Sequence, residues 1–195
     1  EKRADFKKLN EKRKFFSKTP EEKYEFLKEW QGELQVFYLA LRTHVKDEQR
    51  PPLNQLISAV RSAMHSVKSV NDIESNISNL RRSSKDFKYN FFIHHKKETE
   101  ALYHQLNALF TQSEAVSFEK LQAIFDIIQH NYSSALHDFY KEALSVRLED
   151  LDVTTVLNFN RELFTSNKAM LMAVKDFLLD EKQAEEFNAV PVYKT

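Results

Sequence analysis

The 195-residue sequence has no cysteine, one glycine and four prolines. The lack of cysteine excludes disulfides, zinc sites built on thiolates and cysteine nucleophiles. A single glycine, Gly32, excludes the glycine-rich loops of P-loop and dinucleotide-binding folds and the Gly-x-Ser-x-Gly turn of serine hydrolases. So few turn residues also exclude a β-sandwich or barrel, because their many short strands each need a turn. The chain is therefore expected to be all-α.

The charges cancel, since 29 Lys and Arg residues balance 29 Asp and Glu residues. This balance gives no global attraction to polyanions, so no nucleic-acid partner is expected. The longest uncharged run, residues 101–113, falls short of the roughly 20 apolar residues that span a bilayer. With neither an initiator methionine nor a signal peptide, the sequence indicates a segment of a longer protein.

The N-terminal part of the sequence divides into a basic arm and a long helix. Residues 1–18 carry eight basic and three acidic side chains, which predicts a basic linker or a short helix. Thr19-Pro20-Glu21-Glu22 then predicts a helix start, because Thr19 accepts from free amides, Pro20 needs no partner there, and Glu22 occupies the capping-box position. Apolar residues recur every three or four positions along this helix, which is expected to reach Glu48: Leu27, Trp30, Leu34, Phe37, Leu41 and Val45.

Four further stripes of the same period predict four more long helices. The second follows Pro51-Pro52 and runs to about Leu80, and the third covers about residues 87–109 after a weak point at Ser83-Ser84. The fourth runs from Ser117 to about Val146, and the fifth covers about residues 152–179 and either ends there or extends to Phe187. Short connections favour an antiparallel bundle of about five long helices, with residues 19–190 forming one domain.

The sequence contains no recognisable catalytic motif. A di-iron bundle needs Glu three residues before His, and no histidine here has one. His44 with Glu48 and His94 with Glu98 match the His-x-x-x-Glu spacing of haemerythrin-like bundles, but no His-x-x-x-His accompanies either. We therefore expect no enzyme activity, no cofactor and no bound metal.

Polar residues interrupt the apolar pattern in two places. On the second helix, a ridge of residues three or four positions apart lies opposite Val70 and Ile77: His65, Lys68, Asp72, Asn76 and Asn79. On the fifth helix, Asn160 and Asn167 are expected to point into the bundle, where an unpaired amide costs roughly 1–3 kcal/mol. The two amides either hydrogen-bond inside the bundle and fix helix register, or belong to a binding surface.

Two segments resemble the PhoU-domain family. Residues 56–62, followed by Val70-Asn71-Asp72 and Asn76-Ile77, are similar to the family signature, in which a carboxylate precedes an Asp by four residues and an Asn-Ile pair follows. Residues 157–163, continuing through 166–171, are similar to the C-terminal cytoplasmic domain of bacterial sodium/phosphate cotransporters. The candidate site residues in the two segments are His65, Lys68, Asp72 and Asn76, and Asn160, Arg161, Glu162 and Asn167.

The resemblance implies a non-enzymatic regulatory or interaction domain of a sodium-dependent inorganic phosphate cotransporter. Such a domain would lie at the cytoplasmic face of the inner membrane, as part of an integral membrane protein. Its expected partner is the transporter membrane domain of the same longer chain, with self-association as a second expectation.

One departure from the family concerns metal. PhoU domains can hold metal clusters through carboxylates four residues apart, whereas this chain has Lys68 at the first position and Asp72 at the second. We expect the Lys68 ammonium to take the place of the metal's charge. The alternative hypothesis is a soluble metal-binding or ligand-sensing helical bundle that uses His65, Asp72 and their neighbours.

Overall fold

The computed structural model describes residues 14–111, 116–143 and 149–189. Throughout these segments the regular structure is helical, which confirms the all-α prediction. A helical turn at residues 14–16 precedes the other elements. These are α2 (Pro20–Arg42), the short 3₁₀ helix η1 (Asp47–Gln49), α3 (Arg50–Asp72), α4 (Glu74–Arg81), α5 (Asp86–Thr111), α6 (Phe118–Ala143), α7 (Asp150–Leu178) and α8 (Glu181–Ala189).

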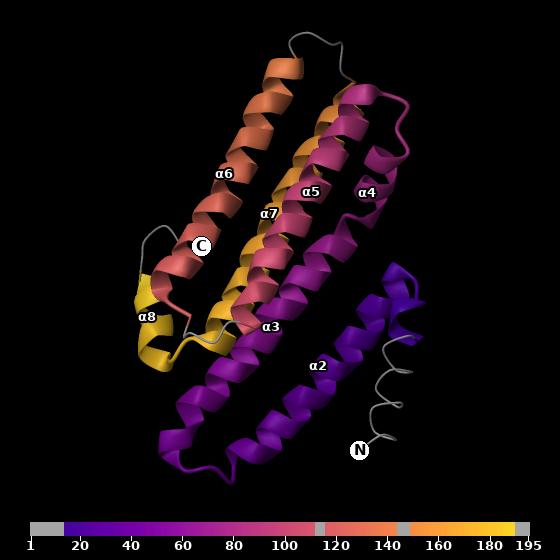
Figure 1. The fold of residues 1–195 in the computed structure, drawn as a ribbon. Coiled ribbons are helices and arrows are strands. Elements are labelled where there is room, and N and C mark those ends of the chain that lie inside the picture. Colours follow the sequence, from indigo (N-terminus) through magenta and orange to yellow (C-terminus); the bar gives the residue numbers. More distant parts are fainter. Residues whose placement is uncertain (1–13, 112–115, 144–148, 190–195) are drawn as a thin grey trace.

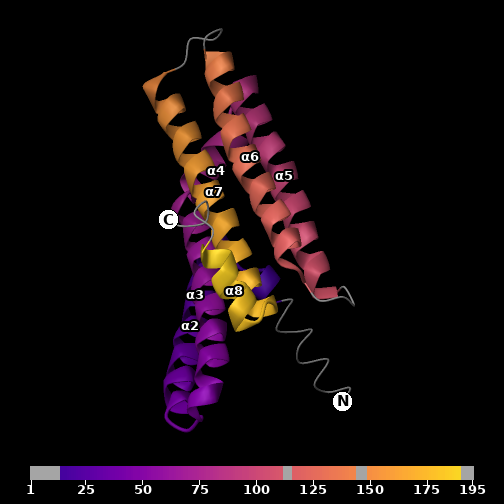
Figure 2. The ribbon, with the colours of Figure 1, turned by 90° about the vertical axis from the view of Figure 1, so that its left-hand side faces the viewer.

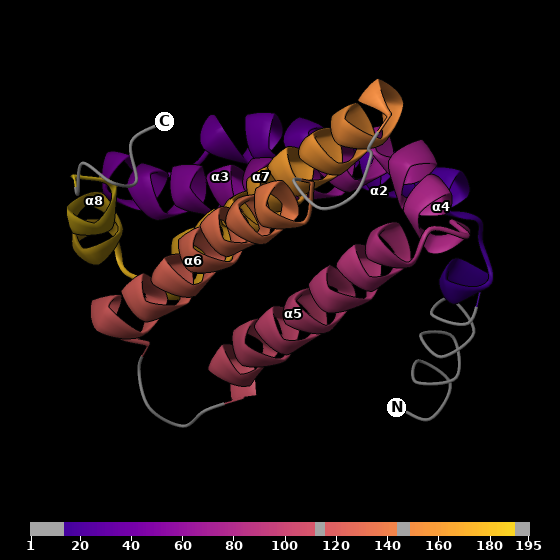
Figure 3. The same ribbon diagram turned by 90° about the horizontal axis from the view of Figure 1, so that it is seen from above.

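The helices pack around a central pair, α3 and α7, which make the most extensive contact in the described part of the chain. Helix α2 packs mainly against α3, α6 packs against α7, and α5 contacts α6 and α7 less closely (Figures 1 and 3). The connection between α2 and α3 projects past the other helices at one end of the molecule (Figures 1 and 2). The centre is therefore formed by two helices that are far apart in sequence.

Two groups of buried apolar side chains hold this arrangement together. The larger group joins α5, α6, α7 and α8, and its fully buried members include Leu121, Phe125, Leu171 and Phe187. The smaller group joins α4, α5, α6 and α7 at the other end: Ile73, Leu80, Phe87, Phe139, Val156 and Phe159. Helix α2 contributes no fully buried residue to either group.

The start of α2 follows the expected capping chemistry. Thr19 Oγ1 accepts a hydrogen bond from the Glu22 amide at 3.2 Å, and the Glu22 carboxylate accepts one from the Thr19 amide at 2.7 Å. This reciprocal pair satisfies backbone donors that the first turn leaves free, and Pro20 at the first helical position needs none. Residues 1–13 of the expected basic arm lie outside the described residues.

Two predicted helix boundaries were wrong, and a third that the sequence left open is decided. Helix α2 ends at Arg42 rather than at Glu48. Just after Arg42, the side chains of Thr43 and His44 both hydrogen-bond to the Ala40 carbonyl. The expected second helix breaks at Ile73, which is 1% exposed, so that α4 is a separate helix that buries Leu80. The last long helix, α7, ends at Leu178, which agrees with the expected end near residue 179. The extension to Phe187 is not part of it, because Leu179 has an extended backbone and Asp180 caps the separate helix α8.

No helix in the described segments combines the length and hydrophobicity needed to cross a bilayer.

Candidate functional site

The structure packs the helices that carry the two motif segments against each other. Ser66 on α3 and Ser166 on α7 share a buried hydrogen bond of 2.9 Å between their hydroxyl oxygens. Asn158 on α7 donates to Asn76 Oδ1 on α4 at 3.2 Å, and Arg161 donates to Asn158 Oδ1 at 2.7 Å. The signature-like segment and the cotransporter-like segment therefore form the central helix pair, linked by neutral polar groups.

The Ser66–Ser166 pair gives a direct test of this packing. Both serines are 1% exposed, so removing one hydroxyl leaves the other buried without its partner. We expect Ser66→Ala and Ser166→Ala each to lower the free energy of unfolding by about 1 kcal/mol, and the double variant to cost less than the sum. A double-mutant cycle by urea denaturation measures this, with the exposed Ser75→Ala as control. Additive effects would contradict the contact.

The polar ridge expected on the second helix is divided between α3 and α4 and lies mostly in solvent. His65, Lys68 and Asp72 are exposed, whereas Asn76 is half-buried by its contact with α7. Lys68 Nζ lies 2.6 Å from Asp72 Oδ2, and this hydrogen bond raises the pKa of Lys68. The expected one-turn ion pair is present, and the structure does not bring His65 to either residue of the pair.

Asn160 and Asn167, the two asparagines of α7 that were expected to point into the bundle, differ in their hydrogen bonding. Asn160 is 2% exposed, and its side chain donates to the Tyr132 carbonyl of α6 at 3.2 Å, so it has the partner that the sequence led us to expect. Asn167 Oδ1 is buried without a hydrogen-bond partner among the described residues. Arg161 is exposed, and its guanidinium lies 3.1 Å from Glu162 Oε1.

A small polar cavity of about 20 Å³ lies beside these asparagines, between α5, α6 and α7. His95 and Glu98 on α5 line it together with Asn160 and Asn167. His95 Nε2 also has no hydrogen-bond partner in the part of the chain that the structure describes. His95 Nδ1 and His94 Nε2 each lie 3.2 Å from an oxygen of Glu98. Burial raises the pKa of Glu98, but these imidazoles outweigh it and hold the pKa below its usual value. The cavity has room for about one water molecule.

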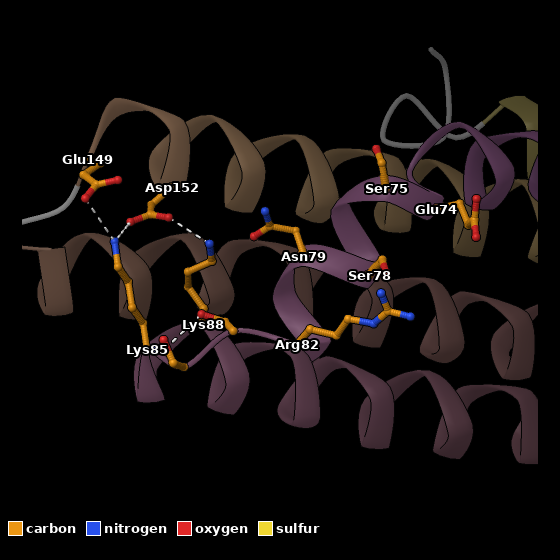
Figure 4. A pocket seen from close by; sticks show the side chains of 11 residues that line it. Glu74, Ser75, Ser78, Asn79, Arg82, Lys85, Lys88, Glu149 and Asp152 are labelled. Carbon is orange, nitrogen blue, oxygen red and sulfur yellow. Dashed lines mark hydrogen bonds and ion pairs between the residues drawn. The ribbon is translucent and has the colours of Figure 1, made fainter.

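A charged cluster forms a second candidate site where α5 and α7 begin (Figure 4). Lys85 Nζ lies 2.5 Å from Asp152 Oδ2, and Lys88 Nζ lies 2.8 Å from Asp152 Oδ1. Glu149 lies 3.5 Å from Lys85 and is largely exposed. Because Lys88 is 6% exposed and Asp152 is 4% exposed, this ion pair is buried.

The charged cluster forms one wall of an open pocket of about 830 Å³, and α4 forms the opposite wall with Ser78, Asn79 and Arg82 (Figure 4). The charges that line the pocket balance, with Arg82, Lys85 and Lys88 against Glu74, Glu149 and Asp152. The arrangement therefore ties α5 to α7 and presents a neutral polar surface, without an excess of charge that would attract an ion of one sign.

The basic and the acidic residues of this cluster were both visible in the sequence, but the contact between them was not predicted. Residues 81–97 hold six basic side chains and one acidic one, and Asp152 belongs to an acidic group at the start of the last long helix. Acidic residues in a first helical turn are explained by the helix dipole alone. Only the packing of α5 against α7 shows that Lys85 and Lys88 neutralise Asp152.

Apolar side chains are also exposed along α2. Trp30, Leu34 and Phe37 are 53%, 45% and 64% exposed, although they belong to the stripe that the sequence placed on one face of the helix. A separate apolar groove of about 490 Å³ lies between α3, α5 and α7 and includes Phe110 and Phe177. Exposed apolar surfaces of this kind mark sites of interaction with other macromolecules.

Within the described segments, no three His, Asp or Glu side chains are placed to hold one metal ion. Comparisons with protein-family models, curated proteins and solved structures give no match.

Proposed function

We propose that this chain is a non-enzymatic regulatory domain of a sodium-dependent inorganic phosphate cotransporter, placed at the cytoplasmic face of the inner membrane. The observation that carries the proposal is the packing of the two motif-bearing stretches against each other. The motif residues Asn76 and Asn158 are hydrogen-bonded, and Ser66, which lies between the motif residues of α3, bonds to Ser166. This packing supports the interpretation of both stretches as parts of one PhoU-like bundle.

The mechanism that fits such a domain is conformational. A regulatory domain shifts a transporter between states only if it contacts those states with different affinity. The exposed apolar groove between α3, α5 and α7 offers area for such contacts. The partner in this proposal is the membrane domain of the same longer chain.

The coding sequence upstream of Glu1 tests this proposal most directly. We expect it to encode several hydrophobic segments of about 20 residues each, which is the length that spans a bilayer. A start codon close to Glu1, with no such segments before it, would overturn the assignment to a transporter.

The metal chemistry of the α3 ridge provides an independent prediction. Lys68 occupies the position where the family pattern places a carboxylate, and its ammonium is paired with Asp72. We expect the Lys68→Glu variant, which restores two carboxylates one turn apart, to bind Zn²⁺ at least about tenfold more tightly than the wild type.

Isothermal titration with Zn²⁺ measures this difference, and Lys68→Gln separates loss of the lysine charge from gain of a carboxylate. Stoichiometric iron or zinc in the wild-type protein, purified without added metal and lost in Asp72→Asn, would contradict the prediction. That result would favour the alternative of a metal-binding bundle.

A further inference from the structure

Helix α2 presents an apolar face that nothing in the described chain covers. Trp30, Leu34, Phe37 and Leu41 follow one another at spacings of four, three and four residues, which is the spacing of core positions in a coiled coil. The first three are 45–64% exposed, and only Leu41, near the end of the helix, is half-buried. We name these four residues the α2 stripe.

We propose that the α2 stripe is a self-association interface, in which the α2 helices of two copies of this chain pack antiparallel. This inference stands on α2 alone and holds whether or not the chain belongs to a transporter. It assigns the uncovered face to one partner, a second copy.

The shape of the α2–α3 hairpin favours a second copy as the partner. Helix α2 packs mainly against α3, and the end of the hairpin projects past the rest of the molecule, so a second hairpin has access to it (Figures 1 and 2). Two helical hairpins that meet along apolar stripes complete a four-helix bundle. Because the same stripe serves both copies, the contact closes on itself and does not propagate into a filament.

The charge distribution along α2 favours the antiparallel arrangement. The first half of the helix, residues 20–31, holds four glutamates against Lys23 and Lys28. The rest of the helix, residues 32–42, holds one charge of each sign, Glu33 and Arg42, and the turn that follows holds Lys46 next to Asp47 and Glu48. An antiparallel pair places the acidic half of each copy beside the neutral half of the other, whereas a parallel pair brings the two acidic halves together and aligns the helix dipoles.

The exposed area sets the expected strength. A large aromatic side chain covers roughly 150–250 Å², so Trp30 and Phe37 alone expose on the order of 200 Å² per copy. With Leu34, Leu41 and the flanking side chains of both copies, the contact approaches the low end of specific interfaces, about 1,200 Å². We therefore expect a reversible dimer with a micromolar dissociation constant.

Trp30 makes the test direct, because it is the only tryptophan in the sequence and lies in the proposed interface. Sedimentation equilibrium of the 195-residue chain from low-micromolar to hundred-micromolar concentration is expected to show the mass doubling. The fluorescence maximum of Trp30 should shift to the blue over the same range.

Two glutamate substitutions on α2 distinguish disruption of the α2 stripe from a general effect of added charge on the dimer. Phe37→Glu is expected to weaken the dimer at least about tenfold, whereas Leu39→Glu, at a 59% exposed residue on the far side of α2, should leave it unchanged. Circular-dichroism melting curves establish that each variant is folded.

Two results would overturn the proposal. The wild-type chain could stay monomeric throughout the concentration range, in which case binding to phosphatidylglycerol vesicles with the same Trp30 blue shift would assign the face to a lipid surface. Equal weakening by Phe37→Glu and Leu39→Glu would show that the α2 stripe is not the interface.

Discussion

Replacing Asp152 with alanine is expected to lower the free energy of unfolding by about 3–5 kcal/mol, because it leaves the Lys88 ammonium buried without its carboxylate. Lys88 is 6% exposed, and its Nζ lies 2.8 Å from Asp152 Oδ1. Lys85 is more exposed and can turn into solvent, so the cost comes mainly from Lys88. Urea denaturation followed by circular dichroism measures the change.

Two control variants locate the origin of this effect. The double variant Lys88→Met/Asp152→Leu removes both charges and keeps similar volume, so its stability should return close to that of the wild type. Asp72→Ala breaks an exposed one-turn ion pair and should change stability little. An Asp152→Ala variant no less stable than Asp72→Ala would show that the charged cluster does not join α5 to α7.

The same cluster predicts how stability depends on pH. Burial raises the pKa of Asp152, but hydrogen bonds from Lys85 and Lys88 outweigh it and hold the pKa below its usual value. The stability that this group adds is therefore complete above the unfolded-state pKa of about 3.9 and is lost as the pH falls through the lower folded-state pKa. The stability difference between wild type and Asp152→Asn should stay constant from pH 7 to about pH 5 and shrink below about pH 4. A difference that shrinks between pH 7 and pH 5 would contradict this assignment.

The helical class and several helix starts could be predicted because they depend on local chemistry. Thr19, Pro20 and Glu22 satisfy the first turn of α2 by themselves, so their spacing alone identified the cap. The break at Ile73 could not be found in this way, because no proline or glycine marks it. It arises where the chain turns to bury Ile73 and Leu80 together in the smaller core.

The candidate sites show the same division between local and long-range information. The Lys68–Asp72 pair spans one helical turn, so its spacing predicted the contact. The Ser66–Ser166 contact joins residues 100 positions apart, and the Lys88–Asp152 contact joins residues 64 positions apart. Pairings at that separation are decided by which helices become neighbours, and the central α3–α7 pair is not consecutive in sequence.

The exposure of Trp30, Leu34 and Phe37 could not be predicted from the sequence, for another reason. Periodicity shows that residues share a face, but it does not show whether that face meets the same chain or another one. Helix α2 has the stripe of a buried helix, but among the described helices only α3 is a main neighbour. The pattern in the sequence is therefore consistent with a partner outside the chain, which is the basis of the proposed α2 interface.

Replacing Phe187 with alanine is the other change expected to have a large effect, with a loss of about 3–5 kcal/mol in the free energy of unfolding. Phe187 is fully buried, and its ring packs edge-on against Phe118 with centroids 5.3 Å apart. It holds α8 against the larger core, and α8 also supplies Asn188, which accepts a hydrogen bond from the buried Lys175 at 2.6 Å. Loss of the Phe187 ring therefore weakens both the apolar contact and the partner of a buried ammonium.

Phe177→Ala provides the matched control, because Phe177 lies near the end of α7 but is 57% exposed. Its truncation should cost less than about 1 kcal/mol, as is usual for surface positions. Hydrogen exchange distinguishes how the Phe187 variant fails: amides of α8 should lose protection first, because α8 is a short helix whose stability depends on docking. Equal denaturation midpoints for Phe187→Ala and Phe177→Ala, with α8 still protected in both, would show that Phe187 does not hold α8 in place.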